Sequence, residues 1–111
     1  MDDKTLIEKV INGDRAAIRL LVEENKNLIW HIIISMVGHN SDCEDLFQEV
    51  FFRVLKGCRS FRAEARLSTW MGSITHHVCV DYLRKKNRET NFQRSEADPE
   101  IALNLSPDMS W

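Results

Sequence analysis

The residues best suited to chemistry in this chain are basic side chains that gather in its middle. Between Phe51 and Thr90, nine Lys and Arg residues stand against three acidic ones, whereas residues 1–50 carry five basic and ten acidic residues. Segment 91–111 is acidic again, with one basic and four acidic residues. Because phosphate groups attract Lys and Arg, the middle segment is the part of the chain suited to a nucleic-acid backbone.

These basic residues form two groups with a helical pattern between them. The first group includes an aromatic ring suited to stack on a base and consists of Arg59, Phe61, Arg62 and Arg66. The second is the run Arg84, Lys85, Lys86, Asn87 and Arg88. On a helix that starts near Leu67, the side chains of Ser73, His77 and Arg84 share one face. This pattern predicts a groove for a sugar-phosphate backbone; the alternative is a solvated helix end whose cations complement the helix dipole.

A second candidate surface lies on the preceding helix, which is expected over residues 42–58. Its apolar stripe predicts a buried face and consists of Leu46, Phe47, Val50, Phe51, Val54, Leu55 and Cys58. Phe52 points away from that stripe, among Asp45, Gln48, Glu49 and Lys56. A large aromatic among carboxylates is typical of an anchor for a protein partner, and the alternative is a contact with another part of the same domain.

The sequence holds little that would support catalysis or metal binding. It lacks a Gly-rich phosphate loop, a nucleophile elbow and an H-E-x-x-H motif. A zinc site needs about four ligands, whereas the pairs His39/Cys43 and His77/Cys79 fall on different elements. The three cysteines form no C-x-x-C pair, which favours reduced, buried thiols. We therefore expect no enzyme activity, no cofactor and no metal.

Helices must position these residues, because apolar residues recur at three- and four-residue spacing and strand-like alternation is absent. The fold class expected is all-α, a compact bundle of about four to five helices. The first elements are a helix from Asp3 to Ile11 that ends at Asn12-Gly13, and a helical stretch from an N-cap at Asp14 to Gly38. The polar run from Glu23 to Asn27 leaves open whether this stretch is one helix or two.

The later elements are a helix capped by Ser41 or Asp42, a loop from Arg59 to Arg66, and a last helix capped by Ser68 or Thr69. The core side of the last helix consists of Leu67, Trp70, Met71, Ile74, Val78 and Tyr82, with Val80 on its polar face. We expect this helix to extend to about Arg88. Residues 1–90 would then form one domain. Residues 91–111 would form an acidic linker or tail with at most a short helix from Glu100 to Leu105.

Length and hydropathy set the broad class of the protein. A chain of 111 residues fits one domain with one core. Its apolar runs, such as Ile32 to Ile34, are far too short to span a membrane, and its acidic N-terminus differs from a signal peptide. The sequence thus predicts a soluble cytoplasmic protein that makes no use of a membrane.

One block of the chain resembles a known family. The run from Asp42 to Leu55, D-C-E-D-L-F-Q-E-V-F-F-R-V-L, is followed by Phe61-Arg62, Trp70-Met71, Ile74 and Asp81-Tyr82-Leu83-Arg84. Together these motifs resemble region two of bacterial sigma factors, and above all the small extracytoplasmic-function type. The resemblance covers about Leu6 to Arg88.

This resemblance implies a transcription initiation factor domain that binds core RNA polymerase and opens promoter DNA at the minus-ten element. The polymerase contact, with the clamp helices of the largest subunit, falls on Asp45, Gln48, Glu49, Phe52 and Arg53. The loop from Phe61 to Leu67 and the face with Ser73, His77 and Arg84 would grip the non-template strand and hold a flipped base. Whether an anti-sigma factor also binds is left open.

The chain departs from the family in two ways. The family commonly has an arginine at the position of Ser73 and an asparagine at that of His77, so its promoter preference does not carry over. It also has a second helical domain that reads the minus-thirty-five element, and we expect the 111 residues to be a fragment that lacks it. The alternatives are a sigma-like decoy that binds polymerase or an anti-sigma factor without initiating transcription, and a general binder of duplex DNA.

Overall fold

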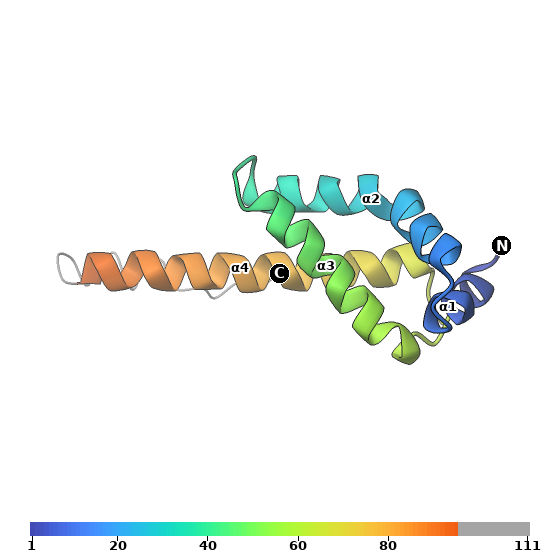
Figure 1. Ribbon diagram of the computed structural model, residues 1–111. Helices are drawn as coiled ribbons and strands as arrows, with labels where there is room; N and C mark the ends of the chain where they lie inside the picture. Colours follow the sequence, from blue (N-terminus) through green and yellow to red (C-terminus); the bar gives the residue numbers. More distant parts are fainter. Residues whose placement is uncertain (96–111) are drawn as a thin grey trace.

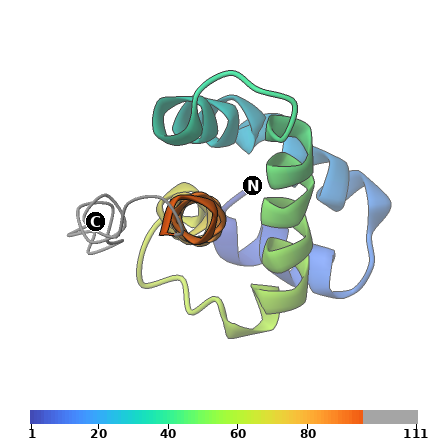
Figure 2. The same cartoon turned by 90° about the vertical axis from the view of Figure 1, so that its left-hand side faces the viewer.

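Four α-helices and one short 3-10 turn make up the described part of the chain. The computed structural model describes residues 1–95, with side chains up to Thr90. The elements are α1 (Asp3–Ile11), α2 (Arg15–Val37), α3 (Cys43–Gly57), the 3-10 helix η1 (Cys58–Ser60) and α4 (Leu67–Ser95). In Figures 1 and 2, α2 and α3 cover two adjoining sides of α4, and α1 lies near the start of α4. The predicted all-α fold class is confirmed.

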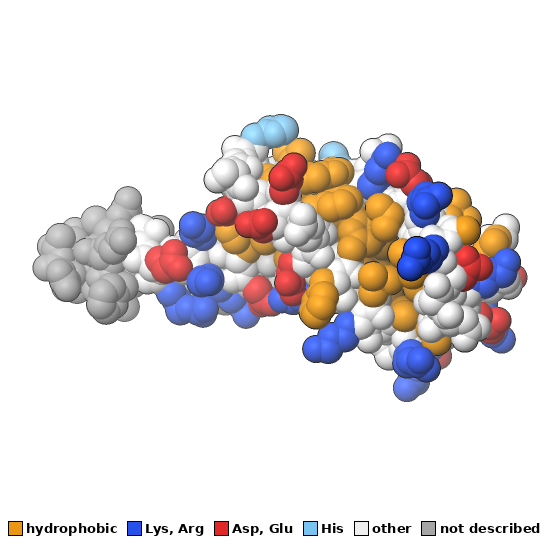
Figure 3. All heavy atoms as spheres, in the orientation of Figure 1, with side chains coloured by type: hydrophobic (Ala, Val, Ile, Leu, Met, Phe, Trp, Pro, Cys, Tyr) orange, Lys and Arg blue, Asp and Glu red, His pale blue; other side chains and the backbone are white. Residues whose placement is uncertain are grey.

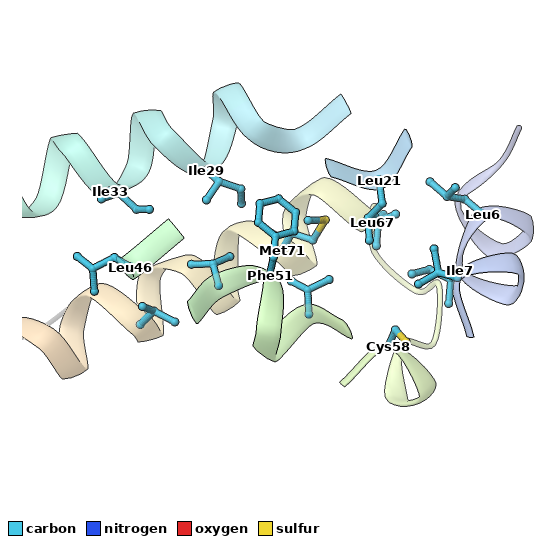
Figure 4. Close-up of a cluster of buried hydrophobic side chains, with 14 of the residues drawn as sticks. Leu6, Ile7, Leu21, Ile29, Ile33, Leu46, Phe51, Cys58, Leu67 and Met71 are labelled. Atoms are coloured by element: carbon cyan, nitrogen blue, oxygen red, sulfur yellow. The ribbon is translucent and has the colours of Figure 1, made fainter. Parts of the chain in front are cut away.

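The core lies where α2, α3 and α4 meet. Leu21, Ile29 and Ile33 of α2, Val50 of α3 and Met71 of α4 are completely buried. Figure 4 shows Ile29 near Phe51 and Met71, Ile33 toward Leu46 and Leu21 toward Leu67, while Leu6 and Ile7 of α1 close the other end of the cluster above Cys58. Each such aliphatic side chain contributes about 1.5–3 kcal/mol when it leaves water. The core therefore fixes the angle between α3 and α4, which carry the candidate sites.

The first two helices are each capped by an aspartate. The Asp2 carboxylate accepts a hydrogen bond of 2.7 Å from the Thr5 amide, and this bond lowers the pKa of Asp2. The Asp14 carboxylate accepts bonds from the amides of Ala16 (2.9 Å) and Ala17 (3.2 Å), as predicted for the start of α2. Between the two helices, Gly13 adopts a φ of +81°, a conformation that glycine reaches without steric cost. The predicted bounds of α1 are confirmed.

The polar run in α2 does not break the helix. α2 continues as one helix through the run, and the buried Asn25 donates from Nδ2 to the carbonyl of Leu21 at 2.8 Å. A side chain that bonds the carbonyl four residues earlier often accompanies a bend. Figure 1 shows such a change of direction between the blue first part of α2 and its cyan remainder.

Two side chains lie where the helical pattern did not predict them. Leu55, expected in the core stripe of α3, is 41% exposed, because it stands at the edge of the stripe beyond the area that α2 and α4 cover. Val80, expected on the polar face of α4, is only 7% exposed.

The start of α4 differs from the prediction as well. The helix begins at Leu67, before either Ser68 or Thr69 could act as its cap. The amide of Leu67 donates instead to the carboxylate of Asp3 in the first turn of α1, at 2.8 Å. A carboxylate at this position satisfies one of the free amides of α4 and interacts favourably with both helix dipoles.

The C-terminal part of α4 projects beyond the rest of the bundle (Figure 1). α4 extends to Ser95, so residues 91–95, assigned above to the tail, are helical. The predicted domain boundary at residue 90 stays a prediction, and the short helix expected from Glu100 to Leu105 lies outside the described residues. None of the helices in residues 1–95 combines the length and apolar character that a membrane crossing requires.

Candidate protein and nucleic-acid interfaces

The outer face of α3 presents an exposed aromatic ring in a polar setting. Phe52 is 62% exposed and lines a shallow hollow together with Asp45, Gln48 and Glu49. The ammonium group of Lys56 lies 6.0 Å from the centre of the Phe52 ring. Phe52 is thus directed at solvent, and the alternative that it is covered by its own domain does not hold for the described residues.

Arg53 connects this face to α4. Its Nε donates to Glu49 Oε2 at 2.7 Å on the same helix, and its Nη1 donates to Asp81 Oδ2 at 3.3 Å on α4. The bond to Glu49 is the main reason why the pKa of Arg53 is raised, and Asp81 adds to it. The guanidinium group is therefore held in one orientation at the edge of the face. Arg53 and Asp81 are 28 residues apart, so no local pattern in the sequence marks them as partners.

A second contact joins the start of α3 to α4. The Tyr82 hydroxyl donates to Asp42 Oδ2 at 2.6 Å, and the ammonium group of Lys86 lies 3.7 Å from the same oxygen. The bond to Asp42, together with burial, raises the pKa of Tyr82 to about 12. Asp42 occupies the predicted N-cap position of α3, but its side chain makes no capping bond because it is turned toward Tyr82.

The loop between η1 and α4 forms a small hollow with an aromatic wall. Residues 60–65 and Trp70 line a space of about 210 Å³. The rings of Phe61 and Trp70 are 5.3 Å apart and tilted by 51°. Phe61 is half-buried against the core, so it offers only part of its ring, and Trp70, predicted on the core side, is also only half-buried. In the same loop, Ala63 adopts a φ of +58°, which costs a residue other than glycine about 1–2 kcal/mol.

The basic side chains lie around this loop and along α4. Arg59, Arg62 and Arg66 are exposed. Arg59 and Arg62 line one hollow with Lys4 and Glu8 of α1, whereas Arg66 lines another with Asp3 and Glu24. On α4, the predicted face is exposed at Ser73, His77, Arg84 and Arg88. Figure 2, a view along α4, shows one side of this helix that neither α2 nor α3 covers.

Lys85 lies apart from the other predicted nucleic-acid residues. It lines a hollow between the start of α3 and the projecting part of α4, together with Asp42, Asp45, Leu46, Tyr82, Lys86 and Glu89. Figure 3 shows acidic side chains at this junction beside the basic side chains of α4. The structure thus separates Lys85 from Arg84, its neighbour in the chain.

The described residues hold no group of three or more His, Cys, Asp and Glu side chains that would suit a metal ion. Cys43, Cys58 and Cys79 are free and buried. Burial raises the pKa of the Cys79 thiol to about 11, with the nearby Cys43 as a second cause. A thiol with such a pKa is a poor nucleophile at neutral pH.

Comparison with known proteins points to one family. The family model described as Sigma-70 region 2 matches residues 21–89. The chain is 32% identical to the ECF RNA polymerase sigma-E factor of Haemophilus influenzae over 88 residues, which cover 79% of this chain and 46% of the relative. It is 32% identical to the ECF RNA polymerase sigma factor SigW of Bacillus subtilis over 83 residues, 75% of this chain and 44% of the relative. The chain thus spans about half the length of these curated relatives.

Proposed function

Because this chain belongs to the sigma-70 region 2 family, in its extracytoplasmic-function (ECF) type, we propose that it is a transcription initiation factor domain. It binds core RNA polymerase through α3 and the unpaired strand of the minus-ten promoter element through the loop 60–66 and α4. The observation that carries the proposal is the exposed Phe52, which stands among carboxylates on α3 and apart from the basic side of α4.

The polymerase contact rests on the chemistry of the outer face of α3. An exposed aromatic ring is a typical anchor of a protein interface, and Phe52 is bordered by Asp45, Gln48 and Glu49. Carboxylates beside such an anchor suit a partner surface that carries basic side chains. Arg53 adds a donor whose position is fixed by Glu49 and Asp81. The clamp helices of the largest polymerase subunit are the partner that this proposal assigns to the face.

The strand contact rests on the loop and on the open side of α4. The hollow beside Phe61 and Trp70 offers aromatic surface to a base that has left the stack. Flipping a base costs a few kcal/mol, so stacking in this hollow and hydrogen bonds from residues such as Ser73 and His77 must compensate for it. The exposed Arg59, Arg62, Arg66, Arg84 and Arg88 supply the positive charge for phosphates.

In this role the chain performs no catalysis itself, since the polymerase makes the RNA. Its partners are core polymerase and promoter DNA, and it acts in the cytoplasm, where both are found.

The test is a fluorescence titration of the chain, with and without core RNA polymerase, against an unpaired minus-ten-like strand and its duplex. We expect tight binding only when polymerase and the unpaired strand are both present. Replacing Arg62 and Arg66 by Ala should weaken strand binding and flatten its salt dependence by about 0.7 in slope for each phosphate that is no longer neutralised. The matched control replaces Arg15 and Arg19, two exposed arginines of α2.

The outcomes separate the alternatives. Polymerase binding without preference for the unpaired strand would identify a decoy, and preference for the duplex would identify a general DNA-binding domain. Absence of polymerase binding by the unaltered chain would overturn the proposal. An unchanged salt slope in the Arg62/Arg66 variant would show that these two residues do not contact phosphates of the strand.

A further inference from the structure

The basic run of α4 has two sides that face different surroundings. Successive residues of an α-helix are about 100° apart, so Arg84 and Lys85 point in clearly different directions. Arg84 and Arg88 are four residues apart and continue the face of Ser73 and His77. Lys85 points instead toward the start of α3, where it lines a hollow of about 240 Å³.

The charges around Lys85 do not suit a phosphate backbone. The carboxylates of Asp42, Asp45 and Glu89 line the same hollow, and each of them would repel a nucleic-acid strand. Lys86 is held against one of these carboxylates, 3.7 Å from Asp42, with its ammonium group 5.7 Å from the centre of the Tyr82 ring. Lys85 has no ion-pair partner among the side chains that the structure describes, so its charge is open to a binding partner.

The hollow is continuous with the candidate protein interface. Asp45 lines both this hollow and the shallow one beside Phe52 on the outer face of α3. A protein bound over Phe52 that extends beyond Asp45 therefore contacts the projecting part of α4. The floor of the hollow consists of Leu46 and Tyr82, which gives the mixture of apolar floor and charged rim that is typical of protein interfaces.

We propose that Lys85 contacts core RNA polymerase rather than promoter DNA, so that the polymerase surface runs from α3 across this hollow onto α4. The inference rests on the proposed function, because it takes polymerase as the protein that covers α3. The part of polymerase that reaches the hollow offers a neutral acceptor, such as a backbone carbonyl, to the Lys85 ammonium group, because a carboxylate would meet the same repulsion from Asp42, Asp45 and Glu89 as a phosphate. The DNA side of α4 is then limited to Arg84 and Arg88 among its C-terminal basic residues.

A matched pair of charge reversals tests this assignment. Lys85→Glu and Arg84→Glu change the charge by the same amount at neighbouring positions of one helix. Core polymerase affinity and, at saturating polymerase, the affinity for the unpaired strand are measured for both at several salt concentrations. Thermal unfolding verifies that both variants fold.

We expect Lys85→Glu to weaken polymerase binding by about fivefold to tenfold, because the ammonium donor is lost and a further carboxylate faces the acceptor of the partner, and to leave the strand salt slope unchanged. Arg84→Glu should leave polymerase binding unchanged and lower the strand salt slope by about 0.7. The opposite pattern, with Lys85→Glu acting on the strand alone, would overturn the inference while leaving the proposed function standing. If the unaltered chain does not bind polymerase, the proposed function itself fails.

Discussion

Tyr82 of α4 has a phenol whose pKa is raised well above its ordinary value, chiefly by its hydrogen bond to Asp42. It donates to Asp42 at 2.6 Å, and this bond favours the protonated phenol in the folded state. The folded chain therefore binds the phenolic proton more tightly than the unfolded chain does. The resulting stabilisation is complete below the ordinary pKa of about 10 and is lost as the pH rises through the folded value.

Tyr82 is the only tyrosine of the sequence, so its ionisation can be followed directly by the absorbance of tyrosinate. We expect a midpoint at about 12 in the unaltered chain. Asp42→Ala should move the midpoint toward about 10, because the main cause of the raised pKa is removed. Asp45→Ala, which changes a neighbouring carboxylate that does not bond the phenol, serves as the control. Titration curves that coincide in all three proteins would contradict the hydrogen bond.

The start of α4 depends on α1. Asp3 is a first-turn residue of α1, and its carboxylate also accepts from the first amide of α4 at 2.8 Å. One side chain thus connects two helix ends just beside the loop that carries Arg62 and Arg66. The position of this loop is therefore tied to α1, although α1 contributes no residue to the predicted strand contact.

Asp3→Ala should destabilise the chain by about 1 kcal/mol, because an amide of α4 loses its acceptor and a helix dipole loses a favourable charge. Urea unfolding measures the loss, and amide hydrogen exchange locates it at Leu67. Asp2→Ala is the matched control, since Asp2 caps α1 only, through Thr5. If exchange at Leu67 is no faster in Asp3→Ala than in Asp2→Ala, the contact between the two helices is refuted.

Two surfaces with different charge are held on one core. The acidic outer face of α3 and the basic open side of α4 belong to helices that pack against each other and are joined by the Arg53–Asp81 ion pair and the Asp42–Tyr82 bond. In the proposed function, these contacts set the angle at which polymerase presents the domain to the promoter strand.

Glu49→Lys combined with Gln48→Ala should abolish polymerase binding, because it places a second positive charge beside Arg53 and removes an amide next to Phe52. Helicity measured by circular dichroism should stay unchanged, since both positions are at least partly exposed. Glu23→Lys, the same charge change at an exposed position of α2, should retain binding. Polymerase captured equally well by the double variant in a pull-down would refute the assignment of α3.

Local physics made much of the fold predictable. The bounds of α1, the cap at Asp14 and the outward position of Phe52 depend on residues within one or two turns, and helical periodicity expresses such relations directly. The same holds for the motif run from Asp42 to Leu55, which carried the resemblance to the family. Leu55 and Val80 show the limit, because periodicity orders side chains around a helix but does not tell which of them the rest of the molecule covers.

Which distant residues meet depends on the tertiary fold alone. Asp3 and Leu67 are 64 residues apart, Asp42 and Tyr82 are 40 apart, and Arg53 and Asp81 are 28 apart, so no local pattern marks these pairs. The separation of Lys85 from Arg84 likewise depends on where α3 crosses α4. The helices, the family and the two kinds of surface followed from the order of the residues, whereas helix packing established which side of α4 faces α3, because that depends on the whole core.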